Sequence, residues 1–475
     1  MRTGLLAPDR DWDAAVNDPF LRAHQIGVRM LEIGPRLSPL SIRDQMFRAA
    51  VAIDRACEHR LISKESPILI VGGGAAGGAA AARAIRYGIE VFLVESNPYL
   101  FYRQDRCPTR WVSPTQYDWP APHAGEHEYP WHSIPSKENI ELPWRAAFGE
   151  ELAAQWNLAL RASQLRRDSG ELHVLTSTDF EDALIHQTTR GVRIQARVKL
   201  RPKARRFLEL PLFSLLLFAM GLGDEQCVVD GHGGPAFWAE DSFDRPQLGL
   251  KRKPRVLVSG GGDGALQDFI RLVTGKKSAL EVYEGFNLPE PAKARLEKAI
   301  TWAEDHWQRS AVWSTKRWDC KLLHNLHVGY AEQIEALPPE FWERQPALRV
   351  PGEFDIKLIH SCDHFGPCYA LNHFVALALC KLLEKKGLHP IQQGRRVTKI
   401  EGGSCGKLGC QGHSHQVSSI ESECGRARGS QVFDEGVFNV LVLRHGIAPP
   451  NPLANAPTTQ IRQMLPSHNP WGVEV

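Results

Sequence analysis

Three glycines near position 70 have the spacing of a phosphate-binding turn. Gly72, Gly74 and Gly77 follow the apolar run Ile68–Val71 and precede an alanine-rich segment with the composition of a helix. In a strand–turn–helix unit the first glycine permits a tight turn and the second lets the backbone approach a pyrophosphate. The third lets the helix pack closely on the strand. The pattern therefore predicts a dinucleotide-binding turn.

A carboxylate follows this turn at a suitable distance. Ile89–Glu95 is predicted to be the next buried strand, and Glu95 at its end is placed to hold the two hydroxyls of a ribose. Ala75 and Ala76 open the helix, so their N–H groups and the helix dipole would face the phosphates. Strand, turn, helix and acid agree, which favours a dinucleotide site over a glycine turn that only packs tightly.

The sequence resembles a known superfamily over most of 67–286 and more loosely over 350–446. Residues 67–95 and the later Leu217-Phe-Ala219-Met-Gly221 are similar to the flavoproteins with two dinucleotide-binding domains, which include disulfide reductases and flavin-dependent monooxygenases. The resemblance implies that Gly72, Gly74, Gly77 and Glu95 contact FAD, and that a second domain binds NAD or NADP. Ala219–Gly221 matches the family's Ala-Thr-Gly turn, with Met220 departing from it, and the family's late Gly-Asp motif is not found. Arg103, just beyond the first crevice, is a further candidate for cofactor binding.

A second glycine turn follows the apolar run Arg255–Ser259. Its residues fit two templates: Gly-x-Gly-x-x-Ala resembles the nicotinamide-binding turn of the same superfamily, and Gly-x-Gly-x-Gly resembles the first motif of S-adenosylmethionine-dependent methyltransferases. The candidate residues are Gly260, Gly262, Gly264 and Ala265. Position in the chain favours the nicotinamide cofactor, while a purely structural turn stays open.

An acid is expected to complete this second site. Ala279–Glu284 is predicted to be the next strand, and Glu284 at its end suits the ribose of either ligand. A carboxylate there favours NAD over NADP because a 2′-phosphate would meet like charge. Lys276 and Lys277 nearby oppose that preference. Asp263 brings a carboxylate close to where a pyrophosphate would lie.

Together these patterns predict an α/β protein with two Rossmann-like, doubly wound halves. The expected parts are an N-terminal helical arm over 1–65, an FAD-binding domain over 66–250, a second domain over 251–446 with a helical insertion at about 289–345, and a tail over 447–475. Apolar residues in Phe20–Ile33 and Ile42–Ala56 recur at helical spacing, which indicates the arm. Both halves share one order of elements, namely a glycine turn, an acidic second strand and a final strand that ends in glycine.

Two groups of cysteine and histidine could ligate zinc in principle. They are His360, Cys362, His364 and Cys368, and Cys405, Cys410, His413 and His415. Neither group has paired Cys-x-x-Cys spacing, so no structural metal is predicted. The segment Arg103–Asp118, rich in arginine and aromatic residues, is as well explained by a binding loop as by an ordinary surface loop.

Composition sets the remaining expectations. The chain has 475 residues, ten cysteines and a formal charge of +3, which points to neither nucleic acid nor an anionic membrane as a partner. The N-terminus lacks an apolar leader, and the scattered cysteines suit a reducing compartment, so a cytoplasmic protein is expected. We expect an FAD-dependent oxidoreductase or monooxygenase that uses NAD(P)H on a small-molecule substrate. A homo-oligomer formed through the arm is a further expectation. The rival hypotheses are a methyltransferase-like enzyme and a non-catalytic cofactor-binding or partner-binding protein.

Overall fold

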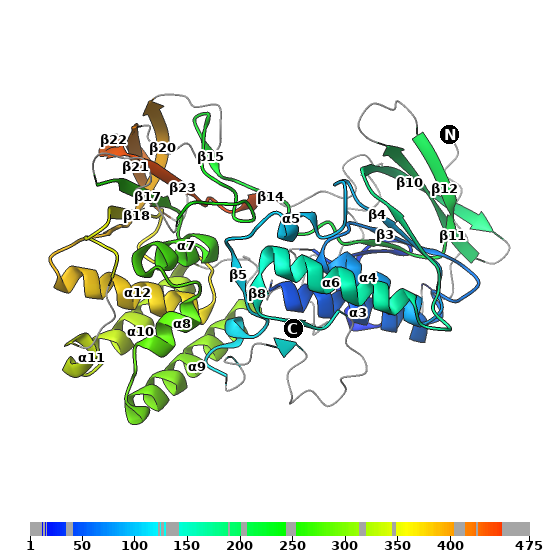
Figure 1. Cartoon of the computed structure of the whole chain (residues 1–475), viewed down its shortest axis with the longest axis horizontal. Coiled ribbons are helices and arrows are strands. Elements are labelled where there is room, and N and C mark those ends of the chain that lie inside the picture. The colour runs from blue at the N-terminus through cyan, green and yellow to red at the C-terminus, as the bar shows by residue number, and fades with distance from the viewer. Residues whose placement is uncertain are drawn as a thin grey trace. The chain divides into compact units, whose positions relative to one another are not determined.

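The computed structural model divides into two compact units (Figure 1). It describes residues 12, 15, 17–34, 41–121, 124, 128–129, 142–188, 191–200, 207–243, 253–312, 320–343, 348–402, 414–423 and 426–448. Of these, the first unit holds the residues up to 108 and those of 128–224, and the second holds those of 109–127 and 225–448. The boundary thus falls at 224, ahead of the expected 250, and a segment after 108 belongs with the second unit.

The first unit is built on a six-stranded sheet. Its strands, in spatial order, are β1 (Gln25–Gly27), β2 (Met30–Glu32), β13 (Leu216–Phe218), β3 (Ile68–Val71), β4 (Val91–Val94) and β9 (Leu172–Leu175). The last five run parallel, and only the β1–β2 pair is antiparallel. Parallel strands direct their carboxyl ends to one edge, which is where ligands of such sheets bind.

Different layers cover the two faces of this sheet. Helices α3 (Ile42–Glu58), α4 (Ala75–Arg86) and α6 (Gly149–Gln164) pack together on one face, with α4 contacting both neighbours. An antiparallel sheet covers the other, formed by β10 (Thr178–Thr188), β11 (Gly191–Leu200) and β12 (Phe207–Phe213). Leu69 and Val71 share a buried cluster with Ile194 of β11, as expected from the alternation of side chains along a strand.

The second unit repeats this plan with a smaller sheet. Its parallel strands, in spatial order, are β19 (Ile391–Gln392), β18 (Asp355–Ile359), β17 (Arg255–Ser259) and β23 (Val440–Leu443). An antiparallel sheet of β20 (Arg395–Gly402), β21 (His415–Glu423) and β22 (Arg426–Phe438) packs on one face, where Val397 and Val417 meet Leu257.

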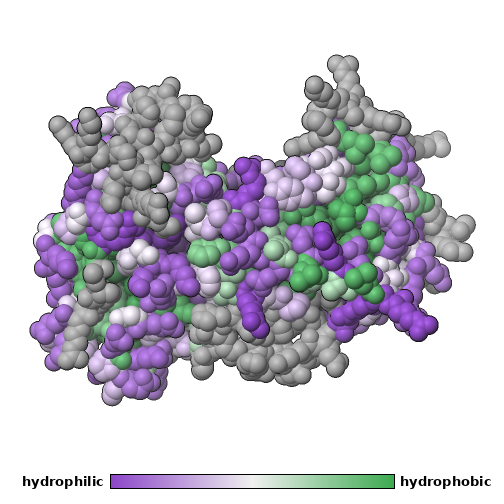
Figure 2. All heavy atoms as spheres, viewed as in Figure 1, coloured by the Kyte–Doolittle hydropathy of each residue, from purple (hydrophilic) through white to green (hydrophobic). Residues whose placement is uncertain are grey.

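Helices cover the other face of the second sheet. They are α7 (Asp263–Thr274), α8 (Ala279–Gly285), α9 (Glu290–Val312), α10 (Cys320–Glu335), α11 (Pro339–Glu343) and α12 (Ala370–Lys385). Three of these helices, α9, α10 and α11, lie within the residues 289–345 where a helical insertion is predicted. Figure 2 shows mostly hydrophilic side chains on the outer side of α9, as expected for a helix with one face in water.

Short elements complete the two units. Those of the first are α2 (Pro19–His24), α5 (Tyr102–Asp105), β6 (Glu128–Tyr129), β7 (Trp144–Arg145) and β8 (Ala147–Phe148). Those of the second are β5 (Trp111–Val112), the 3-10 helix η1 (Gln116–Asp118), β15 (Val228–Val229), β16 (His232–Gly233) and β24 (Ile447–Ala448). Strand β14 (Asp224–Glu225) crosses the boundary in the chain.

Two expectations about the fold need correction. The halves are not doubly wound, because each parallel sheet has helices on one face and an antiparallel sheet on the other. Phe20–Ile33 is not one helix: α2 ends at His24 and the hairpin β1–β2 follows, because β2 finds a parallel partner in β13. The second predicted helix of the arm is present as α3. The predicted tail beyond Ala448 lies outside the described residues.

Candidate dinucleotide site

The first glycine turn has the geometry that a bound pyrophosphate requires. Gly72 has a φ of +109°, and a Cβ there would lie 2.3 Å from the carbonyl oxygen of Ala219. A Cβ at Gly77 would lie 1.8 Å from the carbonyl oxygen of Gly72, so strand and helix touch through backbone. A Cβ at Gly74 would meet nothing within 4 Å. The middle glycine alone thus faces open space, as a ligand-facing position must.

The start of helix α4 adds donors to this open space. Gly74 is the N-cap residue and makes no side-chain cap, and Ala75 and Ala76 form the half-buried first turn. An uncapped helix N-terminus presents N–H groups and the positive end of the helix dipole, which suits phosphate. The predicted residues Gly72, Gly74 and Ala75–Gly77 therefore come together as one cradle.

Glu95 ends β4 beside this cradle. Its carboxylate is 7% exposed and accepts hydrogen bonds from the backbone N–H of Gly73 (2.6 Å) and of Asn97 (2.7 Å), and from the side chain of Asn97 (2.6 Å). These bonds fix the carboxylate against the glycine turn. A carboxylate held in this position can accept bonds from the hydroxyls of a ribose. The predicted position of Glu95 at the end of the second strand is confirmed, whereas its hydrogen bonds with Gly73 and Asn97 were not predicted.

The turn after β13 lies at the same edge of the sheet. Ala219 donates its N–H to Val71 (2.7 Å), next to Gly72. Gly221 has a φ of +75°, and a Cβ there would meet nothing within 4 Å. Arg103 on α5 ties down the continuation of this turn by donating to the carbonyl of Gly223 (3.0 Å). The predicted residues Arg103, Ala219 and Gly221 thus belong to one loop system of the first unit.

The N-terminal strand adds a residue to this edge that the sequence did not indicate. Strand β2 runs parallel to β13, with Glu32 in register with Phe218, and Ile33 donates its N–H to the carbonyl of Phe218 (2.7 Å). The buried Glu32 therefore ends its strand beside the turn at Ala219. Because Phe20–Ile33 is predicted to be helical from its sequence, Glu32 is not expected at a strand end.

The second glycine turn keeps the same backbone frame. Gly260 has a φ of +137°, and a Cβ there would lie 2.2 Å from the carbonyl oxygen of Arg444, much as Gly72 meets Ala219. A Cβ at Gly261 would lie 3.1 Å from Cβ of His360, which corresponds to Gly73 and Glu95 at 3.0 Å. The two turns are structurally equivalent, with a numbering offset of 188 through their helices.

Three side chains change the chemistry of this second frame. His360 holds the position of Glu95, Ala265 that of Gly77, and Asp263 that of Ala75. Asp263 is half-buried at the start of α7, where it accepts bonds from the backbone N–H of Tyr369 (3.0 Å) and the side chain of Asn372 (2.7 Å). Burial raises the pKa of Asp263 despite these hydrogen bonds. A carboxylate of the chain thus occupies the helix start that is left open in the first unit.

The expected acid of the second site is misplaced. Residues 279–284 form helix α8 and not a strand, because the hydroxyl of Ser278 caps it by accepting the N–H of Glu281 (3.2 Å). Strand β18 takes the place beside β17, so the residue after it, His360, faces the turn. The predicted strand that ends at Glu284 is therefore wrong. Gly262 is the N-cap residue of α7 and Gly264 lies in its first turn, and a Cβ at Gly262 would lie 3.7 Å from the carbonyl oxygen of Pro367.

Histidines gather in the core behind the second turn. The rings of His327, His360 and His373 lie 5.0–5.3 Å from the ring of Phe365, and His327 Nδ1 lies 3.0 Å from His373 Nε2. Burial and the neighbouring imidazoles lower the pKa of His360 to about 3, and burial lowers that of His327 to about 4. Cys405, Cys410 and His413 lie outside the described residues.

Comparison with known proteins returns structural similarity only. No protein-family model and no curated protein matches the sequence. Among solved structures, thioredoxin reductase of Lactococcus lactis is 11% identical, with 82% of this chain and 81% of that chain covered and a TM-score of 0.39. Bacillithiol disulfide reductase of Staphylococcus aureus is 10% identical (81% and 77% covered, TM-score 0.40). Lysine monooxygenase of Nocardia farcinica is 14% identical (81% and 81% covered, TM-score 0.34). At these values the similarity assigns no function to this chain. Among the described helices, none has the length and apolarity to cross a membrane.

Proposed function

We propose that the protein is a flavin-dependent oxidoreductase or monooxygenase that holds FAD on the first glycine turn and takes hydride from NAD(P)H. One observation carries the proposal: Gly74 faces open space at an uncapped helix start, while the Glu95 carboxylate is fixed beside it. This cradle fits the pyrophosphate and ribose of a dinucleotide. When bound, the flavin would supply the redox chemistry, and the protein would supply binding and orientation.

Each residue of the cradle has a defined part in this proposal. The N–H groups at the start of α4 would donate to the pyrophosphate, and Glu95 would accept from ribose hydroxyls. Arg103 would hold the loop after β13 in place through Gly223. Glu32 and the turn at Ala219–Gly221 would form the side of the crevice next to β13.

The site of the nicotinamide cofactor stays a separate part of the proposal. Gly260, Gly262, Gly264 and Ala265 keep the backbone frame of such a site. Glu284 does not contribute, and the carboxylate of Asp263 opposes a pyrophosphate at this helix start. The same helical position of Glu284 removes the acid on which an S-adenosylmethionine site would depend, so the methyl-donor alternative has no specific support.

The absorption spectrum of the purified protein tests the proposal. We expect flavin bands near about 450 nm in the wild type after incubation with FAD and desalting. Gly74→Ala is expected to fold with wild-type stability, because the added methyl group meets no protein atom within 4 Å. It should nevertheless lose the bands, because the methyl group occupies the space of the pyrophosphate.

Gly329→Ala is the matched control. A Cβ at Gly329, within α10, also meets nothing within 4 Å, so it adds the same group away from the cradle. This variant should keep its full flavin content. A colourless wild type, or full flavin content in Gly74→Ala, would overturn the proposed site.

A further inference from the structure

Helix α6 of the first unit carries the two most exposed large hydrophobic side chains among the described residues. Leu158 is 71% exposed, and Leu165, the C-cap residue of the helix, is 86% exposed. The two leucines lie about two helical turns apart and therefore on one face of the helix. Exposed leucines scattered singly over a surface are ordinary, whereas two on one helix face mark a surface available for contact.

The opposite face of α6 is anchored in the core. Leu152, Trp156 and Leu160 are buried on that face. The ring centre of Trp156 lies 5.6 Å from that of Phe101 and 5.7 Å from that of Trp144. Turning the helix about its axis would expose this tryptophan, so the outward position of the two leucines is a fixed feature of the fold.

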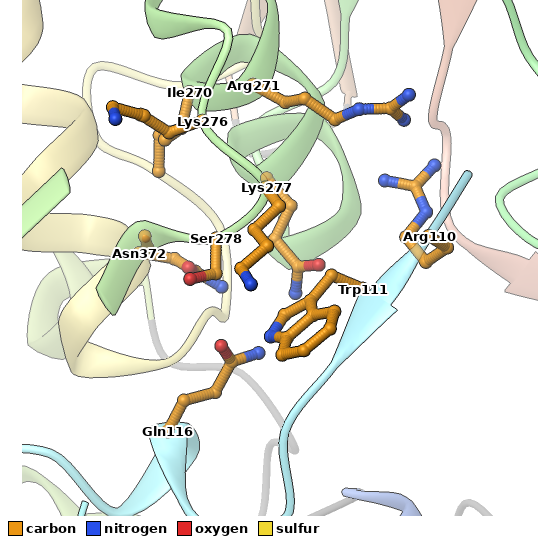
Figure 3. A pocket seen from close by; sticks show the side chains of 11 residues that line it. Arg110, Trp111, Gln116, Ile270, Arg271, Lys276, Lys277, Ser278 and Asn372 are labelled. Carbon is orange, nitrogen blue, oxygen red and sulfur yellow. The ribbon is translucent and has the colours of Figure 1, made fainter. Parts of the chain in front are cut away.

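Large apolar rings near the surface of the second unit are covered by the chain itself. The ammonium group of Lys277 lies 3.7 Å from the ring centre of Trp111 (Figure 3), and that of Lys385 lies 4.9 Å from the ring centre of Trp342. The exposed fractions of the two leucines on α6 show that the described residues give them no comparable cover. A cover for this face therefore has to come from another surface.

Charged side chains stand at the two ends of the same helix. Glu150 is exposed in its first turn, Arg161 is exposed in its last turn, and Arg166 is exposed just after it. None of these three side chains forms an ion pair with a described residue. Acids at the start and bases at the end of a helix suit its dipole. The same order also makes this face complementary to itself when one copy is turned end to end.

The spacing of the residues fits such an arrangement. Glu150 and Arg166 lie equally far from Leu158 along the chain, on either side of it. When two copies of α6 pack antiparallel across Leu158, Glu150 of each copy therefore lies at the level of Arg166 of the other. Ala154 and Ala162 are likewise equally spaced, and their small side chains leave room for the facing leucines. A parallel arrangement would instead bring like charges together.

We propose that α6 forms the contact between two copies of this chain, packed antiparallel about a two-fold axis at Leu158. A second copy fits this face because the face is apolar at its centre and carries charges of both signs in the order that its own copy requires. One helix from each copy makes a contact that is small beside the about 1,200–2,000 Å² of a stable interface, so the dimer dissociates on dilution. The proposal is independent of the flavin site, because none of these residues belongs to the first glycine turn.

Sedimentation equilibrium of the whole protein tests this proposal, at concentrations from about 1 to about 100 µM, the range of a weak association. We expect the wild type to dimerise reversibly over this range. Leu158→Glu and Leu158→Lys should each weaken dimerisation about tenfold or more, because like charges then meet at the two-fold axis. An equimolar mixture of the two variants should form the dimer again, because the acid of one variant faces the base of the other. Only contact between two copies at this position predicts that recovery.

Leu184→Glu is the matched control, since Leu184 is 61% exposed on β10 of the same unit, away from α6. It makes the same change of side chain and should dimerise as the wild type does. A monomeric wild type, unchanged dimerisation of Leu158→Glu, no recovery in the mixture, or an equal loss in Leu184→Glu would each overturn the proposal. Unfolding midpoints should match the wild type in all three variants, because the substituted positions are exposed.

Discussion

The two glycine turns share a backbone and differ in what their side chains leave open. In both, the first glycine passes close to a carbonyl of the neighbouring strand end, and the glycine directly after it (Gly73 or Gly261) packs against the residue that follows the next strand. At the first turn that residue is Glu95, and the helix begins with alanine. At the second turn it is His360, and Asp263 occupies the helix start. A turn can thus keep its backbone geometry while the open space at its helix start is filled by contacts of the chain itself.

The helices that follow the two turns, α4 and α7, also differ in the side chains that hold them in place. Position 80 in α4 is alanine and the equivalent position 268 in α7 is aspartate, and both are fully buried. Helix α4 packs by small side chains, so it can lie close to its neighbours. Helix α7 is held instead by charge, because Asp268 pairs with both Arg110 and Arg444.

Asp268→Ala should have the largest effect on the free energy of unfolding, although alanine is the residue at the equivalent position of α4. Burial would raise the pKa of Asp268, but Arg110 and Arg444 lower it, so it is ionised and paired. Removing it leaves two buried guanidinium groups with one carboxylate fewer, which should lower the free energy of unfolding by about 3–5 kcal/mol. Urea unfolding measures this free energy.

The control is Asp305→Ala, at an exposed position of α9, which should change the free energy of unfolding by less than about 0.5 kcal/mol. A similar loss in both variants would contradict the conclusion that the ion pairs of Asp268 hold α7 in place.

Gly77→Ala tests how closely α4 approaches its strand. The added Cβ would lie 1.8 Å from the carbonyl oxygen of Gly72, so backbone must move. We expect a loss of about 3 kcal/mol and loss of flavin together. Ala265→Gly, at the equivalent position of α7, should cost only about 1 kcal/mol through helix propensity. Equal losses in the free energy of unfolding for Gly77→Ala and Ala265→Gly would show that α4 and α7 lie equally close to their strands.

His360 at the second turn and the nearby His327 should make the stability of the folded protein sensitive to acid. Unfolded imidazoles gain a proton below about pH 6.5, whereas His327 and His360 stay neutral in the folded protein down to pH values of about 4 and 3. The unfolded state therefore binds more protons in this window, and stability falls as the pH drops from 6.5 toward 4. Each histidine contributes up to about 1.4 kcal/mol per pH unit. Urea midpoints at several pH values measure the slope, and an unchanged slope in His360→Gln would be inconsistent with this origin.

Glu284→Ala is expected to have the smallest effect. Glu284 lies on α8 and is exposed, away from the turn it was expected to serve. The Michaelis constant for NADH or NADPH should change by less than about twofold. A tenfold increase would restore Glu284 to the nicotinamide site and break the distinction drawn between the two turns.

Some of the site could be predicted from the sequence because its signals are local. Gly72, Gly74 and Gly77 are required by backbone geometry within one strand–turn–helix unit, and Glu95 follows at the end of the next strand. Ala279–Glu284 failed because a short apolar run does not distinguish a strand from a helix. The cap provided by Ser278 and the burial of Leu280 and Val282 against neighbouring helices decided for the helix.

The sequence by itself determined the two glycine turns, the helix after each, and the carboxylate of Glu95, because these depend on contacts between residues that are close in the chain. Only the tertiary structure decided which strand lies beside each turn. Strand β18 is about a hundred residues from β17, and β2 meets β13 from the opposite end of the first unit. Hydrogen bonding between distant strands and burial of their shared faces make that choice, and it puts His360 at the second turn and Glu32 beside the first.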